Sequence, residues 1–240
     1  MQKTNFGTLY LVPSTLGENS IATIPEYVKQ QVNQLSDFVV EREKSARRFL
    51  KQIGFSKPID SCRFYELDKH SSTDDAMECL QVLLSGNSMG LISEAGIPCV
   101  ADPGALLVEM AHQNTITIKP LVGPSSIILA LSASGLNGQN FCFHGYLPFK
   151  DNERKKTLKQ MEQAVYRFGQ TQIFMETPYR NDQIIEAVLK NCRPNTLFCV
   201  ACDLTLNKEF IKTMPVEEWQ QQKLSIQKRP AIFLLGTYNK

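Results

Sequence analysis

The stretch Ser93-Glu-Ala-Gly-Ile-Pro-Cys-Val-Ala-Asp-Pro-Gly104 directly follows a short apolar run at 89–92 that predicts a buried strand. Glycine and proline this dense after a strand predict a tight loop whose backbone can approach a ligand. In open α/β sheets, ligands bind at the carboxyl ends of the strands. Asp102 is also suitably placed to cap the next helix. The loop therefore has a functional interpretation and a purely structural one, as a turn.

On both sides of this loop, short runs typical of β-strands alternate with segments whose apolar residues recur at helical spacing. Thr23 and Glu26 have the spacing of a capping box. The alternation predicts a mostly parallel sheet with helical crossovers, and 209–212 with 231–237 would form a terminal β pair. The expected strands are 9–12, 38–40, 89–92, 116–122, 172–175 and 197–203, and the expected helices include 45–53, 105–112, 125–134, 151–168 and 181–190.

The length of 240 residues allows one large domain or two small ones. The net charge of +2 argues against nonspecific wrapping of nucleic acid. The charge is uneven, however, at −3 over residues 1–120 and +5 over residues 121–240. An anionic partner could therefore meet the second half, or the asymmetry could be idle surface charge.

The cysteines and the N-terminal sequence favour a cytoplasmic protein. Seven cysteines are scattered, and neither a secretory signal nor an apolar run of membrane-spanning length is visible. Cys199 and Cys202 form a C-x-x-C pattern, but on a strand their side chains point to opposite faces, so we expect two core residues. Because the three histidines lack ligand spacing, no metal site is predicted. A P-loop and a G-x-G-x-x-G fingerprint are absent.

Several motifs in order along the chain resemble the ribosomal RNA small subunit methyltransferase I family, within the tetrapyrrole methylase superfamily. They are Gly7-Thr-Leu-Tyr-Leu-Val-Pro13, Ser93-Glu-Ala-Gly-Ile-Pro98, Ala101-Asp-Pro-Gly104, Gly123-Pro-Ser-Ser126, Leu131-Ser-Ala-Ser-Gly-Leu136, Phe143-His-Gly-Tyr-Leu-Pro148 and Glu176-Thr-Pro-Tyr-Arg180. The resemblance extends from about Gly7 to Gly236. The segments 93–104 and 123–136 are its most specific part.

The resemblance implies an α/β fold of two α/β domains of the tetrapyrrole methylase type, at 1–119 and 120–240, with the cofactor S-adenosylmethionine in the cleft between them. It also implies a homodimer and methylation of a cytidine ribose 2′-hydroxyl in small-subunit rRNA. By position, the cofactor contacts would be Pro13, Ala95, Gly96, Ile97, Pro98, Ser125, Ser126, Met175, Ala201, Pro230 and Ala231.

The chain departs from the family pattern on the acceptor side. Ser14-Thr-Leu-Gly17 replaces Thr-Pro-Ile-Gly, Glu41-Arg-Glu-Lys44 replaces Glu-Asp-Thr-Arg, and Tyr65-Glu-Leu-Asp-Lys-His70 replaces a His-Glu-His-Asn-like stretch. The cofactor expectation is therefore better supported than the acceptor expectation. A tetrapyrrole or another small molecule is an alternative acceptor, and a non-catalytic RNA-binding relative is a third interpretation.

A sugar hydroxyl gains from a base that takes its proton, and Glu41 and Glu176 are the candidates because both follow strands. For Glu41, an ion pair with a neighbouring basic residue is the competing interpretation. Two basic runs, 42–51 and 150–159, could contact RNA phosphates or remain solvated helix faces. Phe149 and Tyr146 beside the second run could stack on a base. The candidate substrate contacts are Arg42, Arg47, Lys150, Arg154 and Arg180.

Overall fold

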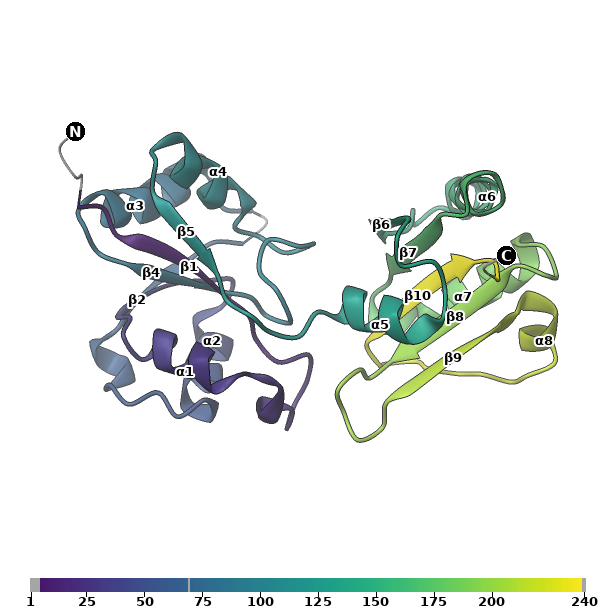
Figure 1. Ribbon diagram of the computed structural model, residues 1–240, viewed down its shortest axis with the longest axis horizontal. Coiled ribbons are helices and arrows are strands. Elements are labelled where there is room, and N and C mark those ends of the chain that lie inside the picture. The colour runs from purple at the N-terminus through teal and green to yellow at the C-terminus, as the bar shows by residue number, and fades with distance from the viewer. Residues whose placement is uncertain (1–4, 69, 239–240) are drawn as a thin grey trace. The chain divides into compact units, whose positions relative to one another are not determined.

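The computed structural model describes residues 5–68 and 70–238, which divide between Ser125 and Ser126 into two compact units, unit 1 and unit 2. Each unit is a five-stranded sheet with helices packed on it (Figure 1). The first unit ends at Ser125. The domain boundary expected from the sequence, after residue 119, stays a prediction. No helix among the described residues is long and apolar enough to cross a membrane.

Unit 1 is a parallel sheet in the order β3-β2-β4-β1-β5, with every neighbouring pair parallel. Its strands are β1 (Thr8–Val12), β2 (Asp37–Val40), β3 (Arg63–Glu66), β4 (Met89–Ile92) and β5 (Thr117–Pro120). Its helices are α1 (Glu26–Val32), α2 (Glu43–Gln52), α3 (Thr73–Leu84) and α4 (Ala105–Gln113), with short 3-10 helices at Ile21–Thr23 and Ile59–Ser61.

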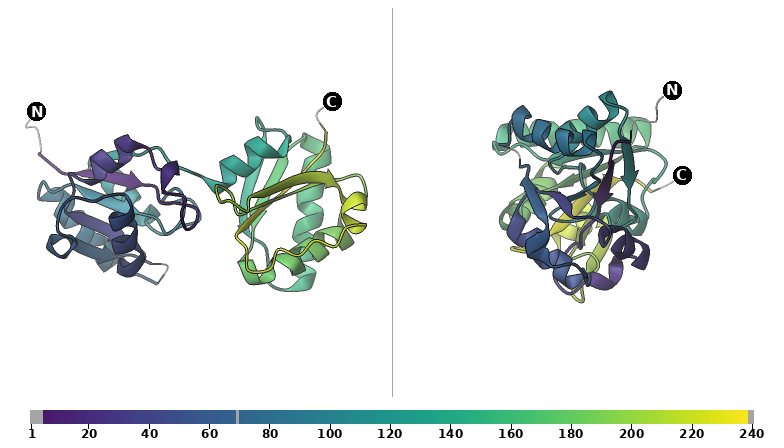
Figure 2. Two further views of the ribbon diagram at one scale, coloured as in Figure 1. Left: turned by 90° about the horizontal axis from the view of Figure 1, so that it is seen from below. Right: turned by 90° about the vertical axis from the view of Figure 1, so that its left-hand side faces the viewer.

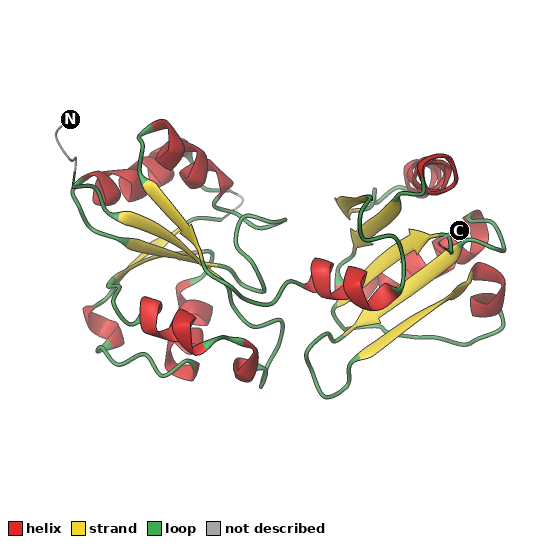
Figure 3. Cartoon of the chain, viewed as in Figure 1, coloured by secondary structure: helices red, strands yellow, loops and turns green. Residues whose placement is uncertain are grey.

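The helices of unit 1 cover both faces of its sheet, α1 and α2 on one side and α3 and α4 on the other (Figures 1 and 3). Two apolar clusters correspond to these layers. Val28 and Leu50 belong to the first cluster, and Leu80 and Leu107 to the second. β2 and β4 are buried at every position because helices cover both of their faces.

Unit 2 is a mixed sheet in the order β6-β7-β10-β8-β9. Only β6 and β7 pair in parallel, and the other three pairings are antiparallel. Its strands are β6 (Phe141–Tyr146), β7 (Thr171–Met175), β8 (Leu197–Cys202), β9 (Phe210–Pro215) and β10 (Ala231–Gly236). Its helices are α5 (Ser126–Ser134), α6 (Asp151–Phe168), α7 (Asn181–Asn191) and α8 (Val216–Gln220), and Pro178–Arg180 forms a 3-10 turn.

The core of unit 2 lies between its sheet and helices α6, α7 and α8. Phe174, Phe198 and Phe233 stack across adjacent strands, with ring centroids 5.6 and 5.9 Å apart. Trp219 of α8 packs edge-on against Phe198 and donates from Nε1 to the Phe198 carbonyl at 2.8 Å. Figure 2 shows the sheet and its flanking helices from two further directions.

Three local expectations were wrong. No capping box forms at Thr23, because its hydroxyl donates to the Ser20 carbonyl and Pro25 stands at the N-cap of α1. Asp102 does not cap α4, whose N-cap is Gly104 in a left-handed conformation. β9 and β10 do not pair with each other, because β8 lies between them. The mostly parallel sheet holds for unit 1 but not for unit 2.

Cys199 and Cys202 lie on β8 at fully buried positions and are free thiols. Burial raises the pKa of each thiol to about 11. Thiols with such a raised pKa are poor nucleophiles and poor metal ligands. Among residues 5–68 and 70–238, no group of three or more His, Cys, Asp or Glu residues is arranged to hold a metal ion.

Candidate functional site

Three loops of unit 1 converge at the carboxyl edge of its sheet. Ser14, two residues after β1, and Gly96, four residues after β4, exchange backbone hydrogen bonds of 2.9 and 3.2 Å. The Ser93 hydroxyl donates to the Gly96 carbonyl at 2.5 Å and lies 3.4 Å from the Ser14 hydroxyl oxygen. The loop after β4 is therefore fastened to the loop after β1.

The loop after β5 joins these two. A Cβ added to Gly123 would lie 2.3 Å from Cγ of Pro13, and one added to Gly96 would lie 3.3 Å from the Pro124 carbonyl oxygen. Gly96 also has a φ of +77°, which an L side chain rarely adopts. Gly96 and Gly123 thus allow the loops after β1, β4 and β5 to approach one another closely. Pro13, the 95–98 segment and Ser125 therefore lie at one edge of the unit 1 sheet, and their contact with a cofactor stays a prediction.

The loop between β4 and α4 holds a strained conformation. Cys99 and Ala101 have φ angles of +66° and +59° without being glycine. Such residues cost roughly 1–3 kcal/mol each and are found mainly where the surrounding structure fixes a functional conformation. Along the 95–98 segment, Ala95 is exposed, Ile97 is partly exposed, and Gly96 and Pro98 are buried.

The predicted contacts in unit 2 also lie close together. Ile232 of β10 is paired with Met175 of β7 on one side and with Ala201 of β8 on the other. Ala231 is paired with Cys202, and the carbonyl of Pro230 accepts from the Asp203 backbone N–H at 2.9 Å. Met175, Ala201, Pro230 and Ala231 therefore occupy neighbouring positions on three adjacent strands. Ser126 is the first residue of α5.

Carboxylates gather at the carboxyl ends of β2 and β4. Glu41 follows β2 directly and lines a small cavity of about 10 Å³ together with Asp102. Burial, with smaller contributions from the negative charges of Glu41 and Glu94, raises the pKa of Asp102 to about 6. From the sequence alone Asp102 is a candidate helix cap and no more, because Glu41 and Asp102 are far apart in the chain and line one cavity only in the folded unit.

Glu176, the other candidate base, has an arginine partner. Its side chain is 1% exposed, and its Oε2 lies 3.2 Å from an Nη of Arg180, close enough for an ion pair although not aligned as a hydrogen bond. Its Oε1 accepts from the Thr177 backbone N–H at 2.8 Å. The Arg180 guanidinium also lies 4.4 Å from the centre of the Phe149 ring. Glu176 is therefore engaged within unit 2, which makes Glu41 the better candidate.

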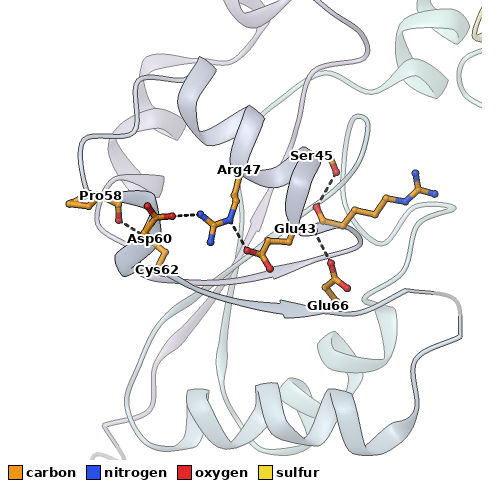
Figure 4. A network of polar contacts seen from close by, with 8 residues as sticks. Glu43, Ser45, Arg47, Pro58, Asp60, Cys62 and Glu66 are labelled. Atoms are coloured by element: carbon orange, nitrogen blue, oxygen red, sulfur yellow. Dashed lines mark hydrogen bonds and ion pairs between the residues drawn. The ribbon is translucent and has the colours of Figure 1, made fainter.

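The candidate substrate contacts differ in their exposure. Arg42 and Lys150 are exposed, whereas Arg47 is divided between Glu43 and Asp60, at 2.6 and 2.7 Å (Figure 4). In the same network, the backbone N–H of Glu43 donates to Glu66 (Figure 4). Arg47 also lies over the Phe64 ring at 4.8 Å. Its charge is therefore largely engaged within unit 1.

Arg154 does not fit its predicted role in substrate binding. It is 7% exposed, donates to the Phe149 carbonyl at 2.9 Å and pairs with Asp151. Its guanidinium holds the turn before α6 and does not face solvent. The run at 150–159 keeps Lys150, Lys155, Lys156 and Lys159 as its exposed positive charges.

A model of the family described as Tetrapyrrole (Corrin/Porphyrin) Methylases matches residues 23–220. The chain is 31% identical to "Ribosomal RNA small subunit methyltransferase I" of Vibrio cholerae, over 88% of this chain and 69% of that protein. It is 30% identical to the protein of the same name from Escherichia coli O157:H7, over 88% of this chain and 70% of the relative. The Streptococcus pyogenes relative is 31% identical over 93% of this chain and 71% of its own length.

Solved structures show the same fold at low sequence identity. The methyltransferase CobJ superposes with a TM-score of 0.63 at 18% identity, covering 97% of this chain and 94% of its own. The cobalt precorrin-4 methyltransferase CbiF gives a TM-score of 0.60 at 15% identity, covering 95% and 94%. These similarities confirm the expected two-domain α/β fold of the tetrapyrrole methylase type. The chain therefore belongs to the tetrapyrrole (corrin/porphyrin) methylase family and, within it, to the ribosomal RNA small subunit methyltransferase I family of methyltransferases.

Proposed function

We propose that this methyltransferase uses S-adenosylmethionine to methylate the ribose 2′-hydroxyl of a cytidine in small-subunit rRNA. The observation that carries the cofactor part is the convergence of the loops after β1, β4 and β5, fastened by the bridge between Ser14 and Gly96. The acceptor part rests on the names of the relatives and on the family resemblance. Exposed basic residues, among them Arg42 and Lys150, support a polyanionic acceptor.

The loop between β4 and α4, residues 93–104, suits the cofactor chemically. Gly96 leaves no side chain between the backbone and a bound molecule. Because the bridge to Ser14 uses both the N–H and the C=O of Gly96, polar contacts to the cofactor would come from other backbone groups of the loop. The proposed contacts in unit 1 are Pro13, the 95–98 segment and Ser125. Those in unit 2 are Ser126, Met175, Ala201, Pro230 and Ala231. When bound, S-adenosylmethionine would supply an electrophilic methyl group on a positively charged sulfur.

Transfer of this methyl group is an in-line displacement, so the chain contributes mainly orientation and exclusion of water. The attacking hydroxyl must lose its proton, and we assign Glu41 as the group that accepts it. Glu41 lies at the carboxyl edge of the unit 1 sheet and lines one small cavity with Asp102.

The cofactor assignment is tested by titrating S-adenosylmethionine into the purified chain in a calorimeter. Because the Ala95 side chain is exposed, Ala95→Arg should leave unit 1 folded. The larger side chain should occupy the space proposed for the cofactor and abolish measurable binding. Ala22→Arg, at another exposed alanine of unit 1, is the matched control and should bind as the unchanged chain does. Unchanged affinity in Ala95→Arg, with normal thermal unfolding, would contradict the assignment.

The acceptor class is tested with labelled S-adenosylmethionine. Small ribosomal subunits from a bacterial strain deleted for the similar methyltransferase should take up the label. A tetrapyrrole carboxylate offered under the same conditions should not. Uptake by the tetrapyrrole alone would establish the small-molecule alternative.

The family resemblance and the cysteines also support proposals on the oligomeric state and the cellular location of the chain. We propose a homodimer, which the family resemblance implies, and light scattering at defined concentrations measures it. We also propose a cytoplasmic location, which is supported by seven cysteines that are all free.

A further inference from the structure

Unit 1 contains a cavity of about 240 Å³ beside the converging loops. It lies where β1, β2 and β4 end and α2 begins. Its apolar lining includes Val40, Phe49 and Ile92, and its polar lining includes Ser45, Arg48 and Glu94. The cavity therefore combines an apolar wall with hydrogen-bonding groups of both kinds, which is the usual composition of a small-molecule site.

The size of the cavity limits what can enter it. Pockets that hold drug-sized ligands measure about 300–1,000 Å³. A cavity of about 240 Å³ is below this range, so it suits a single ring system with a few substituents. A tetrapyrrole macrocycle is far too large. One nucleobase of an RNA, turned out from its neighbours, is of the right size, and enzymes acting on nucleotides commonly bind such bases in close-fitting pockets.

The polar groups indicate which base fits. Glu94 accepts a hydrogen bond from the Ser45 hydroxyl, which orients its carboxylate. An ionised carboxylate only accepts hydrogen bonds, and it pairs with the exocyclic amine of cytosine. Uracil presents an oxygen at that position, so two acceptors would oppose each other. Arg48 and Gln52, which also line the cavity, have donors for the ring carbonyl O2 that both pyrimidines share.

Resting on the proposed function, we propose that this cavity receives the acceptor nucleobase and that Glu94 selects cytosine over uracil. Glu94 is thus a specificity-determining residue that contacts the base and takes no part in the methyl transfer itself. Ser45 is a positioning residue that acts through Glu94. Glu94 thereby gains a role in the 93–104 loop, where it is not one of the proposed cofactor contacts.

The test compares two acceptors. One is the small ribosomal subunit with its natural cytidine at the position that the unchanged chain labels, and the other carries uridine there. We expect the unchanged chain to methylate the cytidine substrate at least roughly tenfold faster. In Glu94→Gln the amide can donate to the uracil oxygen, so the ratio should shrink towards one or reverse. Assays at pH 8, above the pKa of about 6 of Asp102, keep that group ionised throughout.

Glu109→Gln is the control, because Glu109 is an exposed residue of α4 whose carboxylate accepts a hydrogen bond from Gln113 of the same helix. It should keep the tenfold preference. Ser45→Ala should also reduce the preference for the cytidine substrate. It replaces Glu94→Gln as the test if Glu94→Gln does not fold. Equal rates on both substrates with the unchanged chain, or an unaltered ratio in both variants, would overturn the proposal. Absence of transfer to either subunit would overturn the proposed function and this inference with it.

Discussion

At the residue scale, Asp102 connects the shape of the β4–α4 loop to its electrostatics. Its carboxyl group is partly buried in a loop that also contains two left-handed non-glycine residues, Cys99 and Ala101. Burial, aided by Glu41 and Glu94, raises its pKa from 3.8 to about 6. The folded chain therefore binds this proton more tightly than the unfolded chain. The contribution of Asp102 to stability falls as the pH rises from about 4 to about 6.

Asp102→Asn should remove this dependence, because the amide does not ionise. The expected result is that the free energy of unfolding of the variant, relative to the unchanged chain, increases between pH 4 and pH 6 and is then constant. Urea unfolding at several pH values measures it. A difference that stays constant from pH 4 to pH 8 would show that Asp102 titrates normally. Asp74→Asn, at an exposed position of the first turn of α3, is the control for a carboxylate outside the loop.

At the element scale, the turn before α6 depends on one buried arginine. The Arg154 guanidinium bridges the Phe149 carbonyl and the Asp151 carboxylate from within the helix. Substitution would leave this carbonyl without its donor. Hydrogen bonds to charged groups contribute about 1.5–3 kcal/mol to stability.

Arg154→Ala should therefore destabilise unit 2 by about 1.5–3 kcal/mol, as measured by chemical denaturation. Lys155→Ala, one residue further along and exposed, should change stability by no more than about 0.5 kcal/mol. If instead Arg154→Ala unfolds like the unchanged chain and loses only RNA affinity, Arg154 would be a phosphate contact after all.

The elements that could be predicted are those with strong local patterns. β4 and α6 have the predicted bounds, because an apolar run and an amphipathic period are local signals. β3 and β6 were missed. Both are edge strands with exposed residues at their ends, so neither presents a continuous apolar run. The central position of β10, between β7 and β8, depends on contacts between distant segments that no local pattern contains.

In the candidate site, the loops could be predicted from local sequence, whereas the contacts of the charged side chains could not. The glycines and prolines of 93–104 and 123–126 mark loops that the structure brings to one edge of unit 1. Neither the cavity that Glu41 and Asp102 share nor the burial of Arg154 has a local signal in the sequence. The sequence therefore predicts the backbone of the site better than its charges.

At the scale of the whole molecule, a net charge of +2 conceals a basic second half. In unit 2 the lysines at 150, 155, 156 and 159 are exposed, while arginines 154 and 180 are engaged in internal contacts. A limited set of exposed cations is suited to selective contact with a structured RNA, because few phosphates are neutralised and base contacts decide specificity.

The proposed methylation of a cytidine ribose in small-subunit rRNA has one direct measurement. It is nucleoside analysis of small subunits incubated with the chain and labelled S-adenosylmethionine, after complete digestion. We predict that the label appears in 2′-O-methylcytidine. Label in a base-methylated nucleoside, in the 2′-O-methyl form of another nucleoside, or in no RNA nucleoside would contradict the claim.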